Sequence, residues 1–526
     1  MTTRRVDADV AIVGSGFSGS LTAMALRRLG RSVVLLERGR HPRLAIGESS
    51  TPLANLLLEQ LCDEYGLDAV RPLSKMGTWQ RTYPGIGCGL KRGFSFYHHT
   101  PGTPFADDHM HARQLLVTAS PHDAISDTHW YRPEFDAFLV AQAEAAGAVH
   151  LDETTVASFT HDDGGVTLRG LRQGEEVAVR SRFVIDASGP RGFLHNALGM
   201  HDEPLVRLPA TAALYAHFTG VDLWQDVMRG PCGGTPPFPV DAAALHHVFP
   251  GGWIWVLRFN NGITSAGVAA TQPLAEALDL QAGEPAWRRL LDLVPSVGEQ
   301  FARARAVTPF VHAPRLAYRA CRVAGRRWAM LPSAAGVIDP LLSTGFPLTL
   351  LGIHRLAEIL DCHWETPQLP AALEEYARQT QRELDATESL VAALYATMGD
   401  FELFKRLTLL YFAAASFTET VRRLGRPEKA RGFLLSGDPR FSGELEACVT
   451  AALRQPSGPE RGALMTRIDR AIAPFDLAGL GDRSRADWHP VSADDLLRAA
   501  TRIGATRDEI QALLERCGFG EPVDQV

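Results

Sequence analysis

Residues Val10–Gly19 have the sequence VAIVGSGFSG, and this stretch decides the fold. Val10–Val13 is a short run of apolar, mostly β-branched residues, which is typical of a buried parallel strand. Gly14, Gly16 and Gly19 follow it in the spacing GxGxxG. In a dinucleotide-binding unit the first glycine permits a tight turn, the second lets the backbone approach a pyrophosphate, and the third lets helix and strand pack closely. The stretch therefore predicts a Rossmann unit.

The segments that follow extend the same unit. Ser20–Leu29 has a helical pattern that ends at Gly30, and Ser32–Leu36 is a second apolar strand. Glu37 ends this strand, 23 residues after Gly14. An acid at that place accepts hydrogen bonds from the ribose of an unphosphorylated adenosine, so we expect FAD or NAD. The alternative is an ordinary strand–helix turn with three chance glycines, which is disfavoured because strand, helix and acid stand in register.

Two later segments favour FAD. Phe183–Asp186 is a buried strand followed by small residues up to Gly189, and Arg326–Gly336 leads through small residues to an Asp-Pro turn at Asp339. Small residues let the backbone close over the second part of a long cofactor. The alternative is two ordinary strand ends. No second glycine motif of this kind is visible for a nicotinamide, so we expect reduced FAD to come from a separate flavin reductase.

The composition excludes several classes of function. Asp plus Glu number 60 and Lys plus Arg 53, and the net charge of −7 argues against nucleic acid as a partner. The seven cysteines form no CxxC pair, so we expect no zinc site, no disulfide framework and a cytoplasmic protein. The chain has no run of about 18 apolar residues, and its first residues lack the apolar core of a signal peptide, so no membrane span is expected.

The order of the predicted elements divides the chain. We expect an α/β, FAD-binding domain at residues 1–365, with an interleaved sheet for substrate and halide, and a mainly helical region at 366–526 that covers the substrate pocket. The elements predicted in the first part include a hairpin, the buried strand after it and an aromatic strand, at Val166–Arg169 with Glu176–Arg180, at Phe183–Asp186 and at His246–Phe259. The helices predicted in the second part are Ala371–Met398, Phe401–Leu424 and Ala493–Cys517.

Two pairs of adjacent histidines, His98 with His99 and His246 with His247, lie in predicted strands. Neighbours on a strand point to opposite faces, so neither pair makes a metal site unaided. We expect no metal.

Five segments resemble the flavin-dependent halogenases, the tryptophan halogenase-like superfamily, over residues 8–360. They are Gly47–Pro52 (GESSTP), Cys88–Phe96 (CGLKRGFSF), Tyr131–Asp136 (YRPEFD), Gly252–Trp255 (GWIW) and Asp339–Gly345 (DPLLSTG). The Arg132 and Asp339 segments are shared with many flavoprotein monooxygenases, whose FAD-binding fold the resemblance implies. Lys91, the Trp pair and Ser-Thr-Gly in this order are more particular. The segments around Lys91 and Trp253 are most similar to the phenol-directed branch.

The resemblance implies an enzyme that uses reduced FAD, dioxygen and chloride or bromide to make hypohalous acid, which reaches a separate aromatic substrate through a tunnel. Lys91 would be the catalytic residue, through its ammonium or as a haloamine. The alternative for Lys91 is a solvated surface lysine, and for Trp253 and Trp255, which share one face of a strand, it is core packing. The residues expected to contact the cofactor are Gly14, Gly16, Phe17, Ser18, Gly19, Glu37, Arg38, Glu48, Ser49, Arg132, Asp186, Gly189, Asp339 and Gly345. Those expected for the halide are Ser343, Thr344 and Gly345, and those for the tunnel and substrate are Trp253, Trp255, Phe94 and Phe96.

Two departures from the family pattern bear on the activity. The family's Ile-Pro after the second Trp is Leu257-Arg258 here, a change that would alter the strand or add a charge near the tunnel. The Glu that the tryptophan-specific branch carries in the Asp-Pro loop is Leu342, which speaks against free tryptophan. We therefore expect a phenol or resorcinol, free or tethered to a carrier, and a monomer or homodimer. The alternatives are a related flavin oxygenase that transfers oxygen or desaturates, and a non-catalytic flavoprotein-like binding protein.

Overall fold

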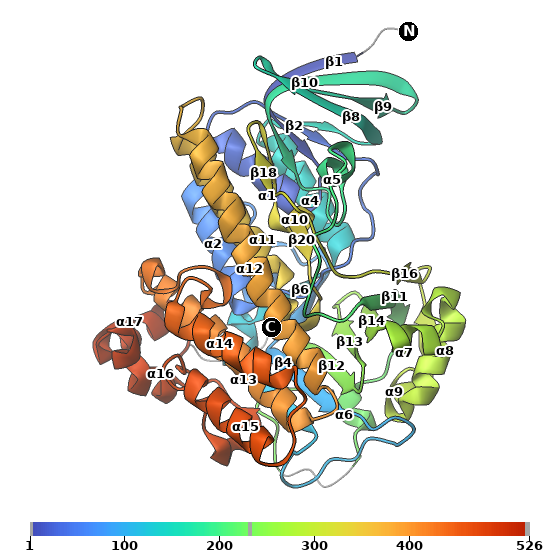
Figure 1. Ribbon diagram of the computed structural model, residues 1–526, viewed down its shortest axis with the longest axis vertical. Helices are drawn as coiled ribbons and strands as arrows, with labels where there is room; N and C mark the ends of the chain where they lie inside the picture. The colour runs from blue at the N-terminus through green and yellow to red at the C-terminus, as the bar shows by residue number, and fades with distance from the viewer. Residues whose placement is uncertain (1–3, 230–233, 521–526) are drawn as a thin grey trace.

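The computed structural model describes residues 4–229 and 234–520, which form two large β-sheets and a layer of helices. The two sheets lie toward opposite ends of the molecule, and the long helix α12 (Leu369–Thr397) runs from beside the first sheet toward the second (Figure 1). The C-terminal helices gather next to the end of α12 (Figure 1). This arrangement confirms the predicted fold class, an α/β Rossmann-type fold with a second sheet and a helical C-terminal region.

The first sheet is built around β1 (Arg4–Val13), which lies between β2 (Val33–Leu36) and β10 (Glu175–Asp186) and is parallel to both. Val13 stands beside Leu36 on one side and Asp186 on the other. Parallel strands bring their carboxyl ends to one edge, so the glycine turn, Glu37 and the small residues after Asp186 leave the sheet together. The other strands of this sheet are β7 (Val149–Leu151), β8 (Thr154–Asp162), β9 (Gly165–Arg172), β18 (Ala324–Gly325) and β19 (Trp328–Met330).

The helix after the glycines, α1 (Phe17–Arg28), begins three residues earlier than the sequence predicts, because Gly16 already serves as its N-cap. Every residue from Phe17 to Leu26 is buried. A helix that is buried all round must have partners on every side. Here α1 packs against the first sheet, α4 (Arg132–Ala145) and α11 (Gly345–Cys362).

The predicted hairpin is present, but its second strand is longer than expected. β9 pairs antiparallel with β10 from Glu175 onward, and Phe183–Asp186 is the end of β10 rather than a separate strand. Burial along β10 alternates at first and becomes continuous in the last four residues. The first part of the strand is exposed on one face, and its last four residues lie in the centre of the sheet. Because the burial pattern changes along the strand, the sequence suggests two strands where there is one.

The second sheet contains nine strands, and its order places β4 beside β12 in parallel. The prediction of one strand over His246–Phe259 is wrong. β12 and β13 are the two arms of an antiparallel hairpin, which turns at Pro250 and Gly251, the latter with a φ of +84°. The strands are β4 (Gly93–His98), β5 (Gln114–Thr118), β11 (Thr211–Thr219), β12 (Ala243–Phe249), β13 (Gly252–Arg258), β14 (Thr264–Thr271), β15 (Arg305–Ala306), β16 (Val311–Ala313) and β21 (Trp488–His489).

The second sheet separates two hydrophobic cores. Its inner face, toward the first sheet and the C-terminal helices, carries His246 stacked on Phe96 at 4.4 Å between ring centres. Its outer face carries His247, which packs on Trp224 at 4.5 Å. The adjacent histidines therefore point to opposite faces, as predicted. Within residues 4–229 and 234–520, no group of three or more His, Cys, Asp or Glu is placed to hold a metal ion.

The C-terminal helices α12 and α13 (Phe401–Arg423) match the predicted helices closely, followed by α14 (Pro439–Ala452) and α15 (Gly458–Ile472). The prediction of one helix over Ala493–Cys517 is wrong, because Gly504 takes a left-handed φ of +63° and interrupts it. The segment forms α16 (Ala493–Ala499) and α17 (Arg507–Arg516), and a capping box between Thr506 and Glu509 starts the second helix.

The remaining elements connect these layers. The helices are α2 (Pro52–Tyr65), α3 (Met76–Thr82), α5 (Phe193–Ala197), α6 (Trp224–Val227), α7 (Gln272–Ala277), α8 (Glu284–Leu293), α9 (Pro295–Gln300) and α10 (Pro332–Ala335). The short strands are β3 (Cys88–Lys91), β6 (Asp127–Trp130), β17 (Tyr318–Arg319) and β20 (Gly336–Val337). In the part of the chain that the structure describes, no helix has both the length and the apolar character needed to span a membrane.

Candidate active site

The three glycines of the first turn differ in their surroundings. Gly14 has a φ of +103°, and a Cβ built on it would overlap the backbone of Ala187. A Cβ on Gly19 would overlap the carbonyl of Gly14. For a Cβ on Gly16, the nearest atoms are the ends of three charged side chains at 3.5–3.6 Å, which is ordinary contact. The fold itself requires the first and third glycines, whereas a Cβ on Gly16 would fit at the start of α1 without overlap.

Glu37 lies where the sequence predicts, buried at the end of β2. Its carboxylate accepts from the Ser15 N–H at 3.1 Å, from the Gly39 N–H at 2.9 Å and from Arg43 Nη2 at 3.0 Å. Burial opposes ionisation, but Arg43 and the two N–H groups outweigh it and lower the pKa of Glu37. Glu37 is therefore an ionised acceptor at this edge, whereas the next residue, Arg38, is exposed.

Arg132 joins three of the predicted segments at the start of α4. Its Nε and Nη2 donate to the two oxygens of Asp136 at 2.8 Å each, and Nη1 donates to the carbonyl of Gly47 at 2.8 Å. The guanidinium also lies over the ring of Phe17, 5.0 Å from its centre. Arg132 thus brings the Gly47 segment, α4 and the start of α1 together beside Gly16.

The loop after β10 is held by Asp186. Its carboxylate accepts from the Ser188 N–H at 2.9 Å and the Leu194 N–H at 2.6 Å. Burial raises the pKa of Asp186, against these hydrogen bonds. Gly189, in the same loop, has a φ of +84°, and a Cβ on it would meet no described atom within 4 Å.

Asp339 anchors the loop that the sequence assigns to cofactor and halide. One carboxylate oxygen accepts from the Leu341 N–H at 2.9 Å, and the other accepts from the hydroxyl of Tyr395 on α12 at 2.8 Å. Burial raises the pKa of Asp339 to about 6, against the hydrogen bonds of Leu341 and Tyr395 and the neighbouring Trp253. The loop therefore stands in contact with both α12 and the second sheet.

The same loop contains two residues in the left-handed region, Leu342 with a φ of +66° and Ser343 with a φ of +56°. Side chains with a Cβ adopt this region at a cost, so the surroundings must hold the loop in place. Tyr411 on α13 does so by donating its hydroxyl to the Leu342 carbonyl at 3.0 Å.

Thr344 is the N-cap of α11 and Gly345 its first residue. The first N–H groups of a helix have no partner within it, and they carry the positive end of the helix dipole. A Cβ on Gly345 would meet no described atom within 4 Å, so the helix begins at open space. Gly47 lies next to it, since a Cβ on Gly47 would stand 3.6 Å from Phe346.

Lys91 is fully buried, and the alternative of a solvated surface lysine is therefore wrong. Its Nζ donates to Ser49 Oγ at 2.8 Å and to the Ser50 carbonyl at 2.5 Å, and lies 3.8 Å from the ring centre of Phe94. Burial lowers the pKa of the ammonium, and the charge of Asp127 opposes this. Lys91 thus links the Ser49 segment to the aromatic face of the second sheet.

Asp127 stands directly opposite Lys91 in the ladder of β3 and β6, so the two side chains share a face. Asn55 donates to its Oδ1 at 2.9 Å. Its Oδ2 is buried without a hydrogen-bond partner among the described residues. Burial raises the pKa of Asp127, and Lys91 lowers it.

An aromatic row on the inner face of the second sheet runs from Lys91 toward Asp339. Phe94 and Phe96 stack at 6.4 Å, Phe96 and His246 at 4.4 Å, and His246 lies 5.3 Å from Trp253. Trp253 and Trp255 lie 5.7 Å apart on the same face, as predicted, and both are buried.

Arg258 does not disturb this face. β13 is unbroken from Gly252 to Arg258 and keeps its register with β14. The guanidinium lies 3.3 Å from Asp241 Oδ1 and donates to the carbonyl of Val221 at 3.0 Å and to that of Asp222. Its charge is therefore neutralised where β13 ends.

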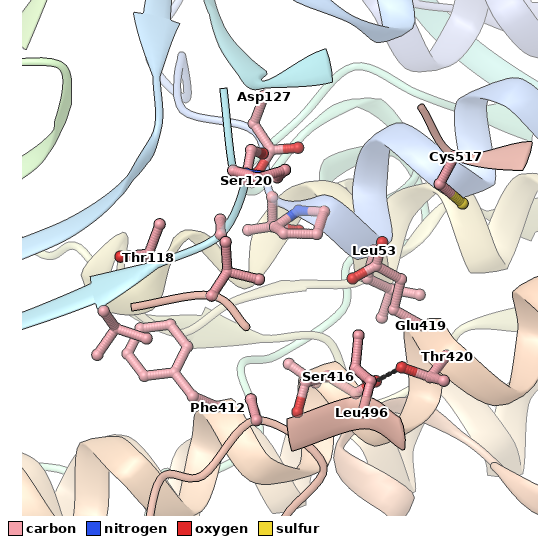
Figure 2. A pocket seen from close by; sticks show the side chains of 18 of the residues that line it. Leu53, Thr118, Ser120, Asp127, Phe412, Ser416, Glu419, Thr420, Leu496 and Cys517 are labelled. Atoms are coloured by element: carbon pink, nitrogen blue, oxygen red, sulfur yellow. Dashed lines mark hydrogen bonds between the residues drawn. The ribbon is translucent and has the colours of Figure 1, made fainter. Parts of the chain in front are cut away.

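A cavity of about 190 Å³, called the pocket below, lies between the inner face of the second sheet, the start of α2, α13 and the segments around α16 and α17. Figure 2 shows Asp127 and Ser120 on one side of the pocket, with Phe412, Ser416 and Leu496 across from them. Phe412 packs on Phe94 at 4.8 Å. An aromatic wall and a few polar groups suit a small aromatic ligand.

Sequence reasoning missed several residues of this site: Arg43, Asp127, Tyr395, Tyr411 and His217, whose Nε2 lies 2.8 Å from Oε1 of Glu48. Arg43 stands six residues after Glu37 in a loop without a motif. The two tyrosines lie on helices whose pattern indicates only a buried face. Asp127 is an acid at the first position of the short strand that ends in Trp130, but the sequence does not show which residue it faces.

Six of the seven cysteines are described, and all six are free thiols; Cys232 lies outside the described residues.

The chain is similar to known proteins over most of its length. A family model described as tryptophan halogenase matches residues 129–402, and one described as an NAD(P)-binding Rossmann-like domain matches residues 12–100. The chain is 30% identical over 403 residues to monodechloroaminopyrrolnitrin halogenase PrnC of Pseudomonas fluorescens, covering 75% of this chain and 69% of that protein. It is also 30% identical over 419 residues to tetracycline 7-halogenase of Kitasatospora aureofaciens, covering 77% and 73%.

The fold is similar to a solved halogenase. The crystal structure of halogenase PltM in complex with phloroglucinol and FAD superposes with a TM-score of 0.81 at 25% identity, and the match covers 91% of this chain and 99% of that one.

Proposed function

The chain belongs to the tryptophan halogenase family, the flavin-dependent halogenases, and on that premise we propose that it halogenates a phenolic ring with hypohalous acid directed by Lys91. The observation that carries the proposal is the position of Lys91. It is fully buried, bound to Ser49 and Ser50, and stands at the end of an aromatic row that leads to the Asp339 loop.

The residues present fit FAD. Gly16 has no side chain to shield the backbone, and the adjoining helix start offers N–H groups to a pyrophosphate. Glu37 is an ionised acceptor for ribose hydroxyls. Glu48 is buried with one oxygen on His217 at 2.8 Å and the other without a partner in the described ranges, which suits a ligand donor at that place.

The remaining cofactor residues fall into two groups. The first group lies at the glycine turn and consists of Gly14, Gly19, Phe17, Ser18 and Arg132. The second group would border the second part of the cofactor and consists of Ser49, Asp186, Gly189, Asp339 and Gly345. FAD, when bound in reduced form, would give two electrons to dioxygen, and the oxygen activated in this way would oxidise a halide to hypohalous acid, with water as the second product. A separate flavin reductase supplies the reduced form.

Chloride or bromide binds at the start of α11. A Cβ on Gly345 would meet no described atom within 4 Å, so the N–H groups of Thr344 and Gly345 are the proposed donors, and Ser343 precedes them with its N–H on the Pro340 carbonyl at 3.0 Å. An anion needs such donors, because burying it without them is costly. Trp253 neighbours Asp339 and lies 5.7 Å from Trp255, and in this proposal the pair separates the loop from the pocket and keeps the substrate apart from the cofactor. This position favours a role beyond core packing.

Lys91 directs the oxidant. An ammonium at this place donates a hydrogen bond to hypohalous acid and makes the halogen more electrophilic, and a neutral amine can take up the halogen. Burial lowers the pKa of Lys91, so both forms are accessible near neutral pH. A compact donor with a flexible stem suits either role.

The substrate is a phenol or resorcinol, free or carried by another protein, and it binds in the pocket beneath the helical region 366–526. Leu342 is fully buried and offers no charged partner for an amino-acid zwitterion. The name of one relative refers to tetracycline, and PltM was solved with phloroglucinol, a phenol. No feature of the described residues favours oxygen transfer instead, because Arg258 is neutralised and leaves its strand intact.

The test is a reconstituted reaction with FAD, a flavin reductase, dioxygen and chloride or bromide over a panel of phenols, indoles and pyrroles. Mass spectrometry should find halogenated phenols that disappear when the halide is omitted. Oxygenated products that form without halide would contradict the proposal and support the oxygenase alternative.

A further inference from the structure

Asp127 differs from the other charged side chains around the pocket. Glu419 pairs with Arg423 at 2.8 Å, and Lys75 pairs with Glu59 at 3.2 Å. Oδ2 of Asp127 has no hydrogen-bond partner among the described residues, although only 4% of the residue is exposed. A buried carboxylate oxygen without a donor costs free energy, so this place is suited to a donor that a ligand brings.

The neighbours of Asp127 determine which of its two oxygens a ligand donor would contact. Asn55 holds Oδ1 at 2.9 Å, which leaves Oδ2 for another partner. Lys91 faces the same side of the β3–β6 ladder and acts on Asp127 through its charge, but its ammonium donates its hydrogen bonds to Ser49 and Ser50. Figure 2 shows Asp127 directed into the pocket, across from Phe412.

We propose that Asp127 is a second catalytic residue, which accepts the ring hydroxyl proton of the substrate while Lys91 directs the halogen; the inference rests on the proposed halogenation. The aromatic wall of Phe94 and Phe412 holds the ring, and the hydroxyl meets Oδ2. The ring carbons next to and opposite the hydroxyl are then the ones presented to the oxidant.

The step balances in atoms and electrons. The ring carbon gives an electron pair to the halogen of hypohalous acid, and the oxygen–halogen bond breaks. The oxygen leaves as hydroxide, takes a proton from the Lys91 ammonium and departs as water. The hydroxyl proton passes to Asp127, so a neutral halodienone forms. The dienone then loses its ring proton to the Lys91 amine and regains a hydroxyl proton from Asp127, which restores both side chains.

The assignment narrows the substrate class. The ring must carry a hydroxyl whose proton can leave, so the O-methyl ether of an accepted phenol is a poor substrate although its ring is activated. Removing the proton during attack avoids a cationic intermediate in a buried pocket, where an unpaired charge is costly. Proton transfer of this kind contributes roughly 10²–10⁴-fold to a rate.

The experiment compares the full-length wild type with Asp127→Asn on para-substituted phenols of graded acidity, with FAD, a flavin reductase and bromide. We expect Asp127→Asn to slow halogenation of weakly acidic phenols by about 100-fold, and the loss to shrink steadily as the phenol becomes acidic enough to ionise unaided. Asp123→Asn is the matched control. It removes the same charge four residues earlier, from a partly exposed ion pair with Arg92, and should leave all rates unchanged.

Two outcomes would overturn the assignment. An equal loss for every phenol would mean that Asp127 acts through Lys91 or the fold, and no loss would mean that it does not act. A second measurement needs no variant: wild-type enzyme should halogenate 4-methylphenol about 100-fold faster than its O-methyl ether, and equal rates would also overturn it. A hypohalous-acid trap separates this inference from the proposed function. If wild type gives the trap no halogen, the proposed halogenation fails first.

Discussion

The cofactor edge of the first sheet and the pocket beside the second sheet are built by different means. At the cofactor edge, Gly14, Gly16 and Glu37 lie within one strand–helix–strand segment, and backbone groups do most of the work. The pocket gathers side chains from the start of α2 to the segment after α17. The two regions therefore tolerate different changes: the first is sensitive to a Cβ at Gly14 or Gly19, and the second to the loss of particular polar groups.

Lys91→Met should give the largest effect, because it removes the donor at the pocket end without changing the cofactor edge. We expect halogenation to fall by about 1,000-fold while oxidation of reduced flavin by dioxygen continues. Product should be counted by mass spectrometry and flavin oxidation followed by absorbance.

Lys405→Met is the matched control for Lys91, since Lys405 is also buried but pairs with Glu402 and Asp487. It should keep its activity when folded. Halogenation by Lys91→Met at the wild-type rate would remove Lys91 from the mechanism.

Gly16→Val probes the cofactor edge alone. Gly16 has a φ of −66°, which valine adopts readily, and a Cβ there would meet only side-chain ends at 3.5–3.6 Å, but the added side chain would block the approach of a pyrophosphate to the backbone. FAD affinity should fall about 100-fold, equivalent to about 2.7 kcal/mol, with the thermal transition retained. Gly14→Val should instead fail to fold, because its Cβ meets the backbone of Ala187. Undiminished flavin binding by Gly16→Val in a titration would contradict the assignment of this edge.

The adjacent histidines of β12 allow the two faces of the second sheet to be tested separately, because His246 lies on the inner face and His247 on the outer face. Burial lowers the pKa of His246 and His247 to about 3, from 6.5 in an unfolded chain. Below pH 6.5 the unfolded chain binds protons that the folded one does not, so stability is full above pH 6.5 and falls toward pH 3. Each histidine contributes about 1.4 kcal/mol per pH unit in that window.

His246→Gln and His247→Gln should each reduce the dependence of stability on pH by one histidine's share in urea unfolding at several pH values. Only His246→Gln should also lower halogenation, because its side chain belongs to the aromatic row. Equal activity losses in the two variants would mean that the face does not matter.

Tyr411→Phe should give the smallest effect. It removes the hydroxyl that holds the Leu342 carbonyl, and we expect a loss of about 1 kcal/mol in unfolding free energy with a few-fold loss of activity. Tyr83→Phe removes a similar bond, to the Ala69 carbonyl at 2.8 Å, outside the site. If the two variants lose the same stability and the same activity, the Asp339 loop does not depend on α13.

The cofactor edge was predictable because its information is local. Three glycines and one acid in register specify a strand, a turn, a helix and a second strand, and the structure has all four. The strand and the helix that were predicted wrongly are those whose residue pattern continues across a turn. Pro250 and Gly251 split one aromatic stretch into a hairpin, and Gly504 divides one helix into two.

The pocket was less predictable, because its polar groups gain meaning only from distant partners. Lys91 was found through a resemblance, and its burial and its bonds to Ser49 and Ser50 follow only from the fold. Asp127 stands out only once β3 and β6 are paired.

The most direct test of the account is a competition between equal amounts of a phenol and free tryptophan, with limiting reduced FAD and bromide. Products are counted by mass spectrometry, and the position of bromine is found by NMR. The account predicts bromophenol in large excess, substituted ortho or para to the hydroxyl, and none without bromide. Predominant bromotryptophan would contradict the substrate class, and product that forms without bromide would contradict halogenation itself.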